Sequence, residues 1–534
     1  ELSDNLEYGY KRAKLSWYTI DPIFFTSQRP GGLTDADLSL NKTRRVYIDE
    51  VFPEVDVADG QQTVINTLDL TYYPTERGPY NYNPSANGSN TLPNPEQNFG
   101  GITRAITSTN FEQSNVEYIQ FWIMDPYYRG SGAPADFDSE NPLNTGKLFF
   151  NLGEISEDVL RDGRKQYENG LPESGNTQNT ITSSWGRIPA SQSLIYAFDT
   201  NEANRAVQDV GYDGLEDKDE NVRFPGFAAT GDASADNYQF YLSAEGDVLE
   251  RYKNYNGLDG NSPVSVSDNN RGNTTIPDVE DINRDNTMNT IDAYFQYAVD
   301  IRPNMPVGEG YITDERITIG RRPEGSQSGT IPVRWIQLKI PIDQGANTVK
   351  VGPIEDFRAI RFMRMFLTGF SEDITIRFAT LDLVRGEWRR YTATLDPLDD
   401  NPDNDQTNFD VQAVNVQENG DKKPINYVTP PGVSREQLFN NNTVVRQNEQ
   451  SLALRVYGNG LEENDSRAVF KNVSVDMRQF NKLKMFLHAE ALPIESPDYK
   501  PLPDRKMIGF IRFGNDFTQN YYQVELPLKV SVPE

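Results

Sequence analysis

One segment pattern recurs three times in this sequence, and it constrains the fold more than any other feature. An aromatic-rich stretch that alternates like a strand is followed each time by a second strand-like stretch. The three pairs are NVEYIQFWIMDP (115–126) with KLFFNLGEI (147–155), FRAIRFMRMFLTGF (357–370) with DITIRFATL (373–381), and FNKLKMFLHAEALP (480–493) with MIGFIRFG (507–514). Short aromatic and β-branched runs between turns are typical of strands. The repeat therefore predicts three copies of one β-sandwich topology.

The first copy carries apolar residues on both of its faces. Ile119, Phe121 and Ile123 face one way, and Val116, Tyr118, Trp122 and Met124 dominate the other. This predicts a strand that is buried on both sides, as inside a sandwich. A second echo links AYFQYAVDI (293–301) to NYYQVELPL (520–528), with DNYQFYLS (236–243) as a weaker third copy.

Turn-rich and acidic stretches divide the chain into five expected parts. The fold class we expect is mostly β, with tandem jelly-roll-like antiparallel β-sandwiches, long polar loops and few short helices. NEANRAVQDV (201–210) is the best helix candidate. The expected parts are a lead-in segment (1–61), a first β-sandwich (62–204), a second β-sandwich with an acidic calcium-loop-like insertion (205–395), an acidic linker (396–436) and a third β-sandwich (437–534).

Composition narrows the class of protein. The 534 residues carry 51 Lys and Arg against 79 Asp and Glu, which gives a net charge of -28. Such a surface repels nucleic acid and anionic lipid, so neither is an expected partner. The chain has no cysteine, which excludes disulfides, thiolate zinc sites and cysteine nucleophiles. No apolar run approaches the roughly 18 residues of a transmembrane helix. The start at Glu1, without Met or a signal-like segment, suggests a mature chain or a piece of a larger protein.

One loop in the middle of the chain has the spacing of a calcium site. Its oxygen-bearing side chains occupy positions 1, 3, 5, 7, 9 and 12, and they are Asp281, Asn283, Asp285, Thr287, Asn289 and Asp292. Calcium takes six to eight oxygen ligands, which a tight loop supplies at alternate positions. Position 6 must turn sharply, and Asn286 stands there, a residue type that tolerates left-handed backbone. The spacing is similar to that of a dockerin calcium loop. The alternative is an Asp- and Asn-rich turn that is simply solvated.

A second acidic cluster lies earlier in the chain. It comprises Asp213, Glu216, Asp217, Asp219 and Glu220. These carboxylates could share a cation, but their spacing matches no known loop. A solvated turn is the simpler interpretation.

The sequence lacks the catalytic motifs of common enzyme classes. His488 is the single histidine, and the pattern around it predicts a half-buried position in a strand over 482–492. The sequence contains no GxSxG, P-loop or GxGxxG motif. Trp122, Trp335 and Trp388 could be sugar-binding platforms, although Trp in such strands is more often part of a core. We therefore predict no catalytic residues and no enzymatic activity.

Eight phrases of the sequence together resemble the SprA/Sov family, giant outer-membrane translocon proteins of the type IX secretion system of Bacteroidetes. They are LEYGYKRAKLSWYTIDPIFF (6–25), LDLTYYPTERGPYNYNP (68–84), NVEYIQFWIMDP (115–126), LGEISEDVLRDGRKQYENGLP (152–172), QDVGYDGL (208–215), PDVEDINRDNTMN (277–289), FRAIRFMRMFLTGF (357–370) and SRAVFKNVSVDMRQFNKLKMFLHAE (466–490). The resemblance implies a role in protein export and gliding motility. It also implies a porin-like shuttle protein, a periplasmic plug protein and secreted cargo with a C-terminal signal as partners.

The chain departs from the whole family protein in one respect. It lacks the regular lipid-facing strands of about ten residues that a membrane barrel uses. We therefore expect an extracellular cap region of such a translocon and not its pore. The alternative function is a calcium-dependent cell-surface glycan-binding protein, since jelly rolls with calcium and exposed aromatic residues often bind sugars. A glycosidase is a third and weaker hypothesis.

Overall fold

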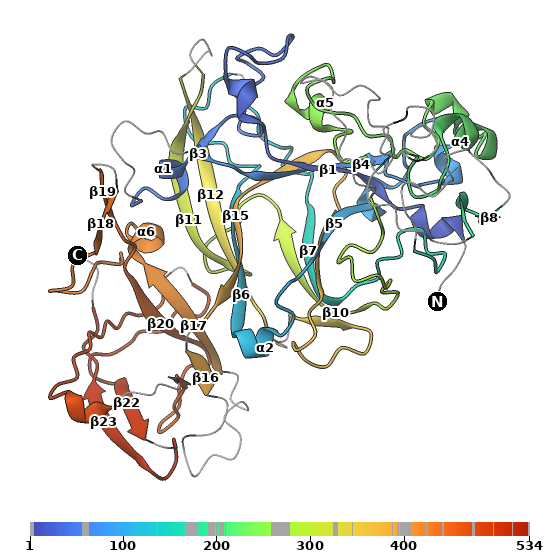
Figure 1. Ribbon diagram of the computed structural model, residues 1–534. Helices are drawn as coiled ribbons and strands as arrows, with labels where there is room; N and C mark the ends of the chain where they lie inside the picture. Colours follow the sequence, from blue (N-terminus) through green and yellow to red (C-terminus); the bar gives the residue numbers. More distant parts are fainter. Residues whose placement is uncertain are drawn as a thin grey trace.

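The structure is a computed structural model of the 534-residue chain, and most of its residues are described below (Figure 1). The described residues are 5–55, 64–135, 137–165, 179–190, 198, 201, 208, 210–257, 278–323, 329–343, 345, 347–386, 388–391, 395, 407–422, 426–440, 443–471, 476–494, 496–514 and 516–531. Antiparallel strands dominate, and the helices are short. The prediction of a mostly β chain with antiparallel sheets and few short helices is therefore confirmed.

A six-stranded sheet forms one layer of the main sandwich. Its order is β1 (Ala13–Tyr18), β4 (Leu68–Arg77), β15 (Ile374–Arg385), β6 (Val116–Met124), β12 (Thr330–Pro341) and β11 (Ile312–Arg321). Every neighbouring pair in this sheet is antiparallel.

A five-stranded sheet forms the other layer. Its order is β13 (Val349–Val351), β10 (Ala293–Ile301), β7 (Gly146–Glu154), β14 (Phe362–Thr368) and β5 (Phe99–Ala105). The two sheets face each other across the centre of Figure 1. Their facing sides share one hydrophobic core, in which the ring of Phe121 from β6 lies 5.1 Å from that of Phe150 from β7.

Strand β6 is buried on both faces, as its sequence predicts. Phe121 and its neighbours on the same face belong to the core between the sheets. On the opposite face, Trp122 and Met124 form a second apolar cluster with Trp335 and Val51. Val51 belongs to α1 (Ile48–Val51), which covers this outer face together with a two-stranded ladder of β2 (Val46–Tyr47) and β3 (Val64–Ile65).

The remaining regular elements of the described part are small. The helices are α2 (Phe111–Ser114), α4 (Asp217–Arg223), α5 (Val248–Tyr252) and α6 (Val416–Asn419), and β8 (Thr180–Thr182) pairs with β9 (Arg187–Pro189). Single 3-10 turns cover Leu6–Gly9, Pro22–Phe25, Pro84–Ala86, Pro95–Gln97, Ala228–Thr230 and Met477–Gln479.

The predicted boundary between the first and second sandwiches does not match the sheets. In the six-stranded sheet, β6 from the range 62–204 lies between β12 and β15 from the range 205–395. In the five-stranded sheet, β7 lies between β10 and β14 in the same way. The two ranges therefore build one sandwich together. Alternation shows that a strand is buried, but it carries no information on a partner some 200 residues away.

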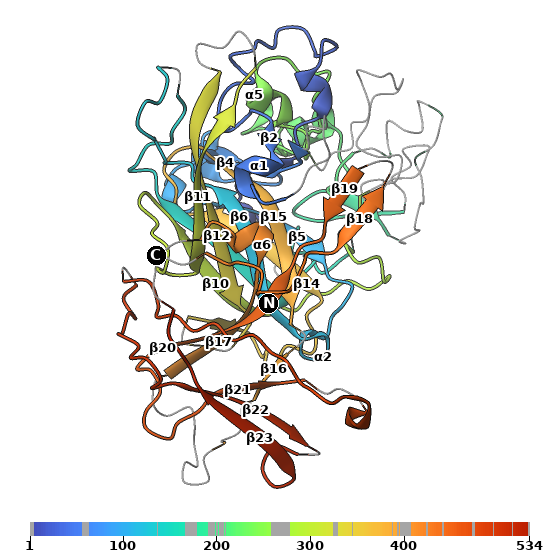
Figure 2. The ribbon, with the colours of Figure 1, turned by 90° about the vertical axis from the view of Figure 1, so that its left-hand side faces the viewer.

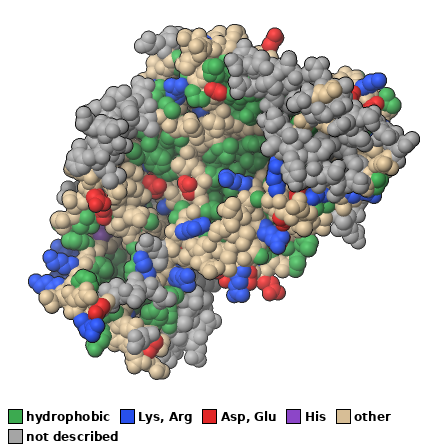
Figure 3. Space-filling model, viewed as in Figure 1, with side chains coloured by type: hydrophobic (Ala, Val, Ile, Leu, Met, Phe, Trp, Pro, Cys, Tyr) green, Lys and Arg blue, Asp and Glu red, His purple; other side chains and the backbone are tan. Residues whose placement is uncertain are grey.

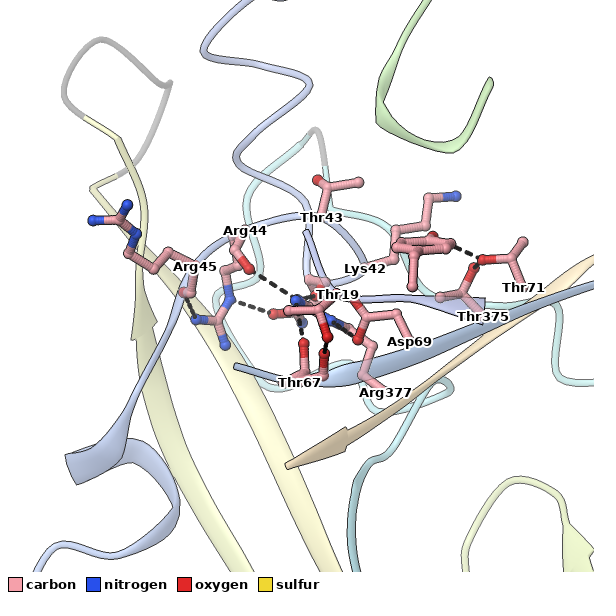
Figure 4. Close-up of polar contacts among 12 residues, drawn as sticks. Thr19, Lys42, Thr43, Arg44, Arg45, Thr67, Asp69, Thr71, Thr375 and Arg377 are labelled. Carbon is pink, nitrogen blue, oxygen red and sulfur yellow. Dashed lines mark hydrogen bonds and ion pairs between the residues drawn. The ribbon is translucent and has the colours of Figure 1, made fainter. Parts of the chain in front are cut away.

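The lead-in segment is held on the sandwich by a buried arginine (Figure 4). Arg377 of β15 donates to the Asp69 carboxylate at 3.1 Å and to the Thr67 hydroxyl at 3.1 Å. Its remaining donors bind the carbonyl oxygens of Asn41 and Arg44 at 2.6 and 2.9 Å. Burial raises the pKa of Asp69, and the Arg377 charge opposes that rise. The lead-in is thus an integral part of the sandwich.

The C-terminal part is built differently, from two-stranded ladders (Figure 2). They are β16 (Arg389–Tyr391) with β21 (Ala468–Phe470), β17 (Thr407–Asn415) with β20 (Gln450–Gly458), β18 (Gln437–Asn440) with β19 (Thr443–Arg446), and β22 (Ile508–Gly514) with β23 (Tyr521–Pro527). Among the described residues, no ladder here is extended to a third strand. Figure 2 shows the ladders β16–β21, β17–β20 and β22–β23 in the lower part of the molecule and the ladder β18–β19 beside the sandwich.

Some sequence predictions of local structure were wrong. The stretch 482–492, predicted as a strand, carries only an isolated bridge at Ala489. The weak copy at 236–243 forms an isolated bridge at Asn237 and a turn at 241–243, and no strand. The helix predicted over 201–210 lies largely outside the described residues.

Candidate functional site

The loop predicted to bind calcium forms a series of tight turns before β10. Asn286 has a φ of 67°, which is the left-handed conformation predicted for it. Asp281 is buried, and its two carboxylate oxygens accept the backbone N–H groups of Asp285 at 3.1 Å and Asn286 at 2.9 Å. The Asp285 carboxylate accepts the N–H of Thr287 at 2.8 Å. These contacts close the turn with groups of the loop itself.

The other predicted ligands of this loop turn toward neighbouring side chains. Asp292 forms an ion pair with Arg161 at 2.8 Å, and the Asn289 amide donates to Glu154. The Asn283 amide donates to Asp285 at 3.2 Å within the loop. The protein therefore satisfies the loop's carboxylates with its own groups. Calcium binding at this loop stays a prediction.

The structure assembles the second acidic cluster into a compact group. Oxygens of Asp213, Glu220 and Asp236 lie within 4.8 Å of one another, and all three residues are fully buried. A second group, which shares Glu220, adds Asp217 and Asp232. The sequence showed Asp213, Asp217 and Glu220 as neighbours. The sequence analysis missed Asp232 and Asp236. They approach α4 only because the chain turns back after this helix, and hydrophobic periodicity does not reveal such a turn.

Burial dominates the electrostatics of this cluster. It raises the pKa of Asp213 to about 7. Burial, followed by repulsion from Asp213, raises the pKa of Glu220 to about 9. The remaining residues named in the cluster, Glu216 and Asp219, lie at the start of α4 and outside the assembled group.

His488 is more exposed than its sequence predicts, with 55% of its side chain open to solvent. Its Nδ1 lies 3.2 Å from the Ser531 hydroxyl, and its Nε2 lies 3.4 Å from a Glu490 oxygen. Glu490 also accepts a hydrogen bond from Lys422. Catalytic triads depend on a desolvated, preorganised site. An open imidazole whose carboxylate is shared with a lysine does not provide one.

Two of the three tryptophans considered as sugar platforms are core residues. Trp122 and Trp335 are fully buried in the cluster on the outer face of the six-stranded sheet. Trp388 is half-buried and lines the groove described next. The glycan-binding hypothesis therefore loses two of its three candidate contacts.

A groove of about 4150 Å³ runs between β11 of the sandwich and the C-terminal ladders. Small-molecule pockets measure about 300–1,000 Å³, so this groove has room for a protein segment. Its C-terminal wall carries many exposed apolar side chains, namely Leu452, Leu454, Phe480, Leu483, Met485, Phe486, Leu487, Ile508, Val524 and Leu526. Figure 3 shows hydrophobic side chains at the surface of this lower-left part of the molecule. We call these ten side chains the apolar wall.

The apolar wall is accompanied by open strand edges. Strand β20 is paired only with β17, and β23 only with β22, among the described residues. Unpaired edges present backbone N–H and C=O groups that can pair with another strand. The arrangement can therefore accept an extended peptide through main-chain hydrogen bonds and apolar contacts.

Comparison with known families gives one match. A family model described as SprA_N, motility related/secretion protein, matches residues 220–534, which is more than half of the chain. Comparison with curated proteins gives no match. Within the described part of the chain, every helix is too short to cross a membrane.

Proposed function

Because the chain belongs to the SprA_N family of motility-related and secretion proteins, we propose that it is a non-enzymatic region of a type IX translocon of the outer membrane. In this proposal it lies at the extracellular face, as part of the cap over the pore, and it serves protein export and gliding motility. The groove with its apolar wall is the surface that contacts the export machinery or its cargo.

The observation that carries this proposal is the apolar wall. Many exposed apolar side chains that line one groove mark an interaction site in folded proteins. Leu454 and Phe486 are 50% and 55% exposed, and both line the groove. Isolated two-stranded ladders are only marginally stable in water. The C-terminal ladders would therefore gain stability by packing against a partner.

The family resemblance suggests which partners to test. A porin-like shuttle protein, a periplasmic plug protein and cargo with a C-terminal signal are the three candidates. An extended cargo segment matches the open edges of β20 and β23 best, because such edges recognise strands.

The experiment is export of a signal-bearing reporter by cells whose translocon carries Leu454→Asp together with Phe486→Asp. One buried apolar anchor contributes about 2 kcal/mol to an interface, so binding should weaken about thirtyfold for each. We expect strong loss of export with the translocon still present in the outer membrane.

The matched control is Leu143→Asp together with Val222→Asp. These apolar residues are 84% and 77% exposed, and neither lines the groove. The control should export normally. Normal export by the Leu454 and Phe486 variant would overturn the assignment of the groove, whereas equal loss in both variants would indicate a general defect in stability.

A further inference from the structure

The assembled acidic cluster brings three fully buried carboxylates together. Asp213 and Glu220 form no ion pair with Lys or Arg in the described part of the chain, and both are fully buried. Asp236 is buried equally and lies with them. Buried carboxylates are normally paired, protonated or bound to a metal, because an isolated buried charge is very unfavourable.

Two arginines lie near the cluster. Arg223 acts on Asp213 through its charge and donates to the Ser183 carbonyl, and the buried Arg77 does not contact the carboxylates. Arg77 uses its donors on the carbonyl oxygens of Asn81, Ala233 and Asp232, at 2.8, 3.0 and 3.3 Å. Its other hydrogen bonds go to the side-chain oxygen of Asn90. Arg77 therefore fixes the backbone of the turn that carries the carboxylates without contacting the carboxylates.

One oxygen at the centre of the cluster has no hydrogen-bond partner. Glu220 accepts the N–H of Ser234 at 2.9 Å through Oε2. Its Oε1 is buried and receives no hydrogen bond from any described residue. Glu220 belongs to both groups of carboxylates, so this oxygen is available to a ligand that the cluster surrounds.

Hydrogen bonds hold the carboxylate of Asp213 in a fixed orientation. Asp213 accepts the Ser234 hydroxyl at 2.8 Å and the Leu215 N–H at 3.0 Å. Tyr82 also donates to Asp213, at 3.5 Å. These groups preorganise oxygens at the site, and a carboxylate oxygen that accepts one hydrogen bond keeps capacity for a cation.

We propose that Asp213, Glu220 and Asp236 bind one divalent cation of the hard, oxygen-preferring class, with calcium as the ion. The donor set is made only of oxygens, which favours calcium or magnesium over zinc and copper. Magnesium usually keeps several of its waters, whereas calcium accepts a shell of protein carboxylates. The buried position of the three residues therefore favours calcium. This site is separate from the 281–292 loop.

The cation would join three points of one stretch of the chain, the turn before α4, α4 itself and the turn that follows it. Asp213 follows β9, and its carbonyl accepts the Arg187 N–H at 2.7 Å. Glu220 belongs to α4, and Asp236 lies in the turn that returns to Tyr80, whose N–H binds the Ser234 carbonyl at 2.7 Å. Calcium would therefore cross-link the lobe at 210–237 internally, and backbone hydrogen bonds already join this lobe to β9 and to Tyr80 after β4.

The test measures calcium binding by titration calorimetry, and terbium luminescence, on the metal-free full chain. Terbium replaces calcium, and Tyr82 lies close enough to sensitise it because its hydroxyl contacts Asp213. We expect one site, a rise of the melting temperature Tm by a few degrees in calcium, and reversal by a chelator.

The variants Glu220→Gln and Asp236→Asn should weaken binding roughly tenfold or more, since each removes a charged ligand. Without calcium, Glu220→Gln should be folded and about as stable as the native chain, because the neutral amide has the shape of the carboxyl group that it replaces. The matched control is Asp285→Asn in the 281–292 loop, where Asp285 is exposed, and it should bind calcium normally.

Two results would overturn the proposal. A folded native chain that binds neither calcium nor terbium would show that the three carboxylates hold protons instead of a metal. Binding that survives Glu220→Gln and Asp236→Asn but is lost in Asp285→Asn would place the ion in the 281–292 loop. Neither result bears on the groove, so the proposed function is tested separately.

Discussion

In the sandwich, the first two copies of the repeated aromatic segment become β6 and β14, and each is paired with a strand on both sides. In the C-terminal part, the third copy at 480–493 carries only an isolated bridge. The same pattern is thus core in one region and surface in the other. An alternating aromatic segment becomes a central strand only where flanking strands and a second sheet cover it.

Burial of apolar side chains follows the same division. The three hydrophobic clusters of the described chain consist of residues up to 383. Beyond residue 383, the buried apolar residues among those described are Val411, at 2% exposure, and Ala489, at 9%. The sandwich is therefore expected to be stable by itself, and the C-terminal ladders are expected to depend on what they contact.

The largest expected difference between the two regions is tested by replacing one Phe in each region with Ala. Phe121→Ala removes a fully buried ring that packs 5.1 Å from Phe150 and 5.7 Å from Phe378. We expect a loss of about 4 kcal/mol in the free energy of unfolding. Phe486→Ala removes a ring that is 55% exposed, and the change should stay within about 0.5 kcal/mol. Chemical denaturation of both variants measures the difference. Equal losses would show that the third copy is packed after all.

The sequence predicted which strand faces are buried better than it predicted which strands pair with each other. The two apolar faces of 116–124 are found in the cores on both sides of β6. The pairing of Ile123 with Ile336 and Phe378 could not be predicted, because hydrophobic alternation is the same for any partner strand. For this reason we expected the ranges 62–204 and 205–395 to form two sandwiches, whereas they form one sandwich together.

The candidate sites show the same limit. The left-handed Asn286 followed from local backbone preferences and is confirmed. Asp213 and Glu220 could be named from one short stretch, but Asp236 joins them only through the turn fixed by Arg77 and Ser234. Contacts between segments decide this site, and no local signal encodes them.

A second test of the difference between the sandwich and the C-terminal part compares one ion pair from each region. Asp69→Asn removes one charge of the buried pair with Arg377 and leaves the arginine unpaired in the core. Breaking such a pair is strongly destabilising, and we expect about 3 kcal/mol, the lower end of the range, because the amide still accepts a hydrogen bond. Thermal unfolding followed by circular dichroism measures the loss.

The matched control in the C-terminal part is Asp476→Asn. Asp476 pairs with Arg478 at 2.8 Å, but the arginine side chain is 90% exposed. Water screens this pair, so the Tm should not change measurably. A fall in Tm as large as that of Asp69→Asn would contradict the idea that the two regions differ in burial.

The smallest effect concerns the seam between the two regions. Asp314 of β11 lies 3.4 Å from Arg316, which also pairs with Asp421 of the C-terminal part at 2.7 Å. Burial raises the pKa of Asp314 from 3.8 to about 6, although Arg316 lowers it. Across the seam, the charge of Asp421 raises this pKa and that of Lys422 lowers it, and Lys339 of the neighbouring β12 also faces Asp314.

Because the folded-state pKa is raised, protonated Asp314 favours the folded state. Its contribution is fully present below about pH 4 and is lost as the pH rises through about 6. Asp314→Asn should therefore match the native chain at pH 4 and be more stable by about 2 kcal/mol at pH 7.5. Denaturation of both proteins across this range measures the difference. Lower stability of the variant at pH 7.5 would contradict this prediction. It would show that the ion pair of Asp314 with Arg316 stabilises the fold by more than the burial of the Asp314 charge destabilises it.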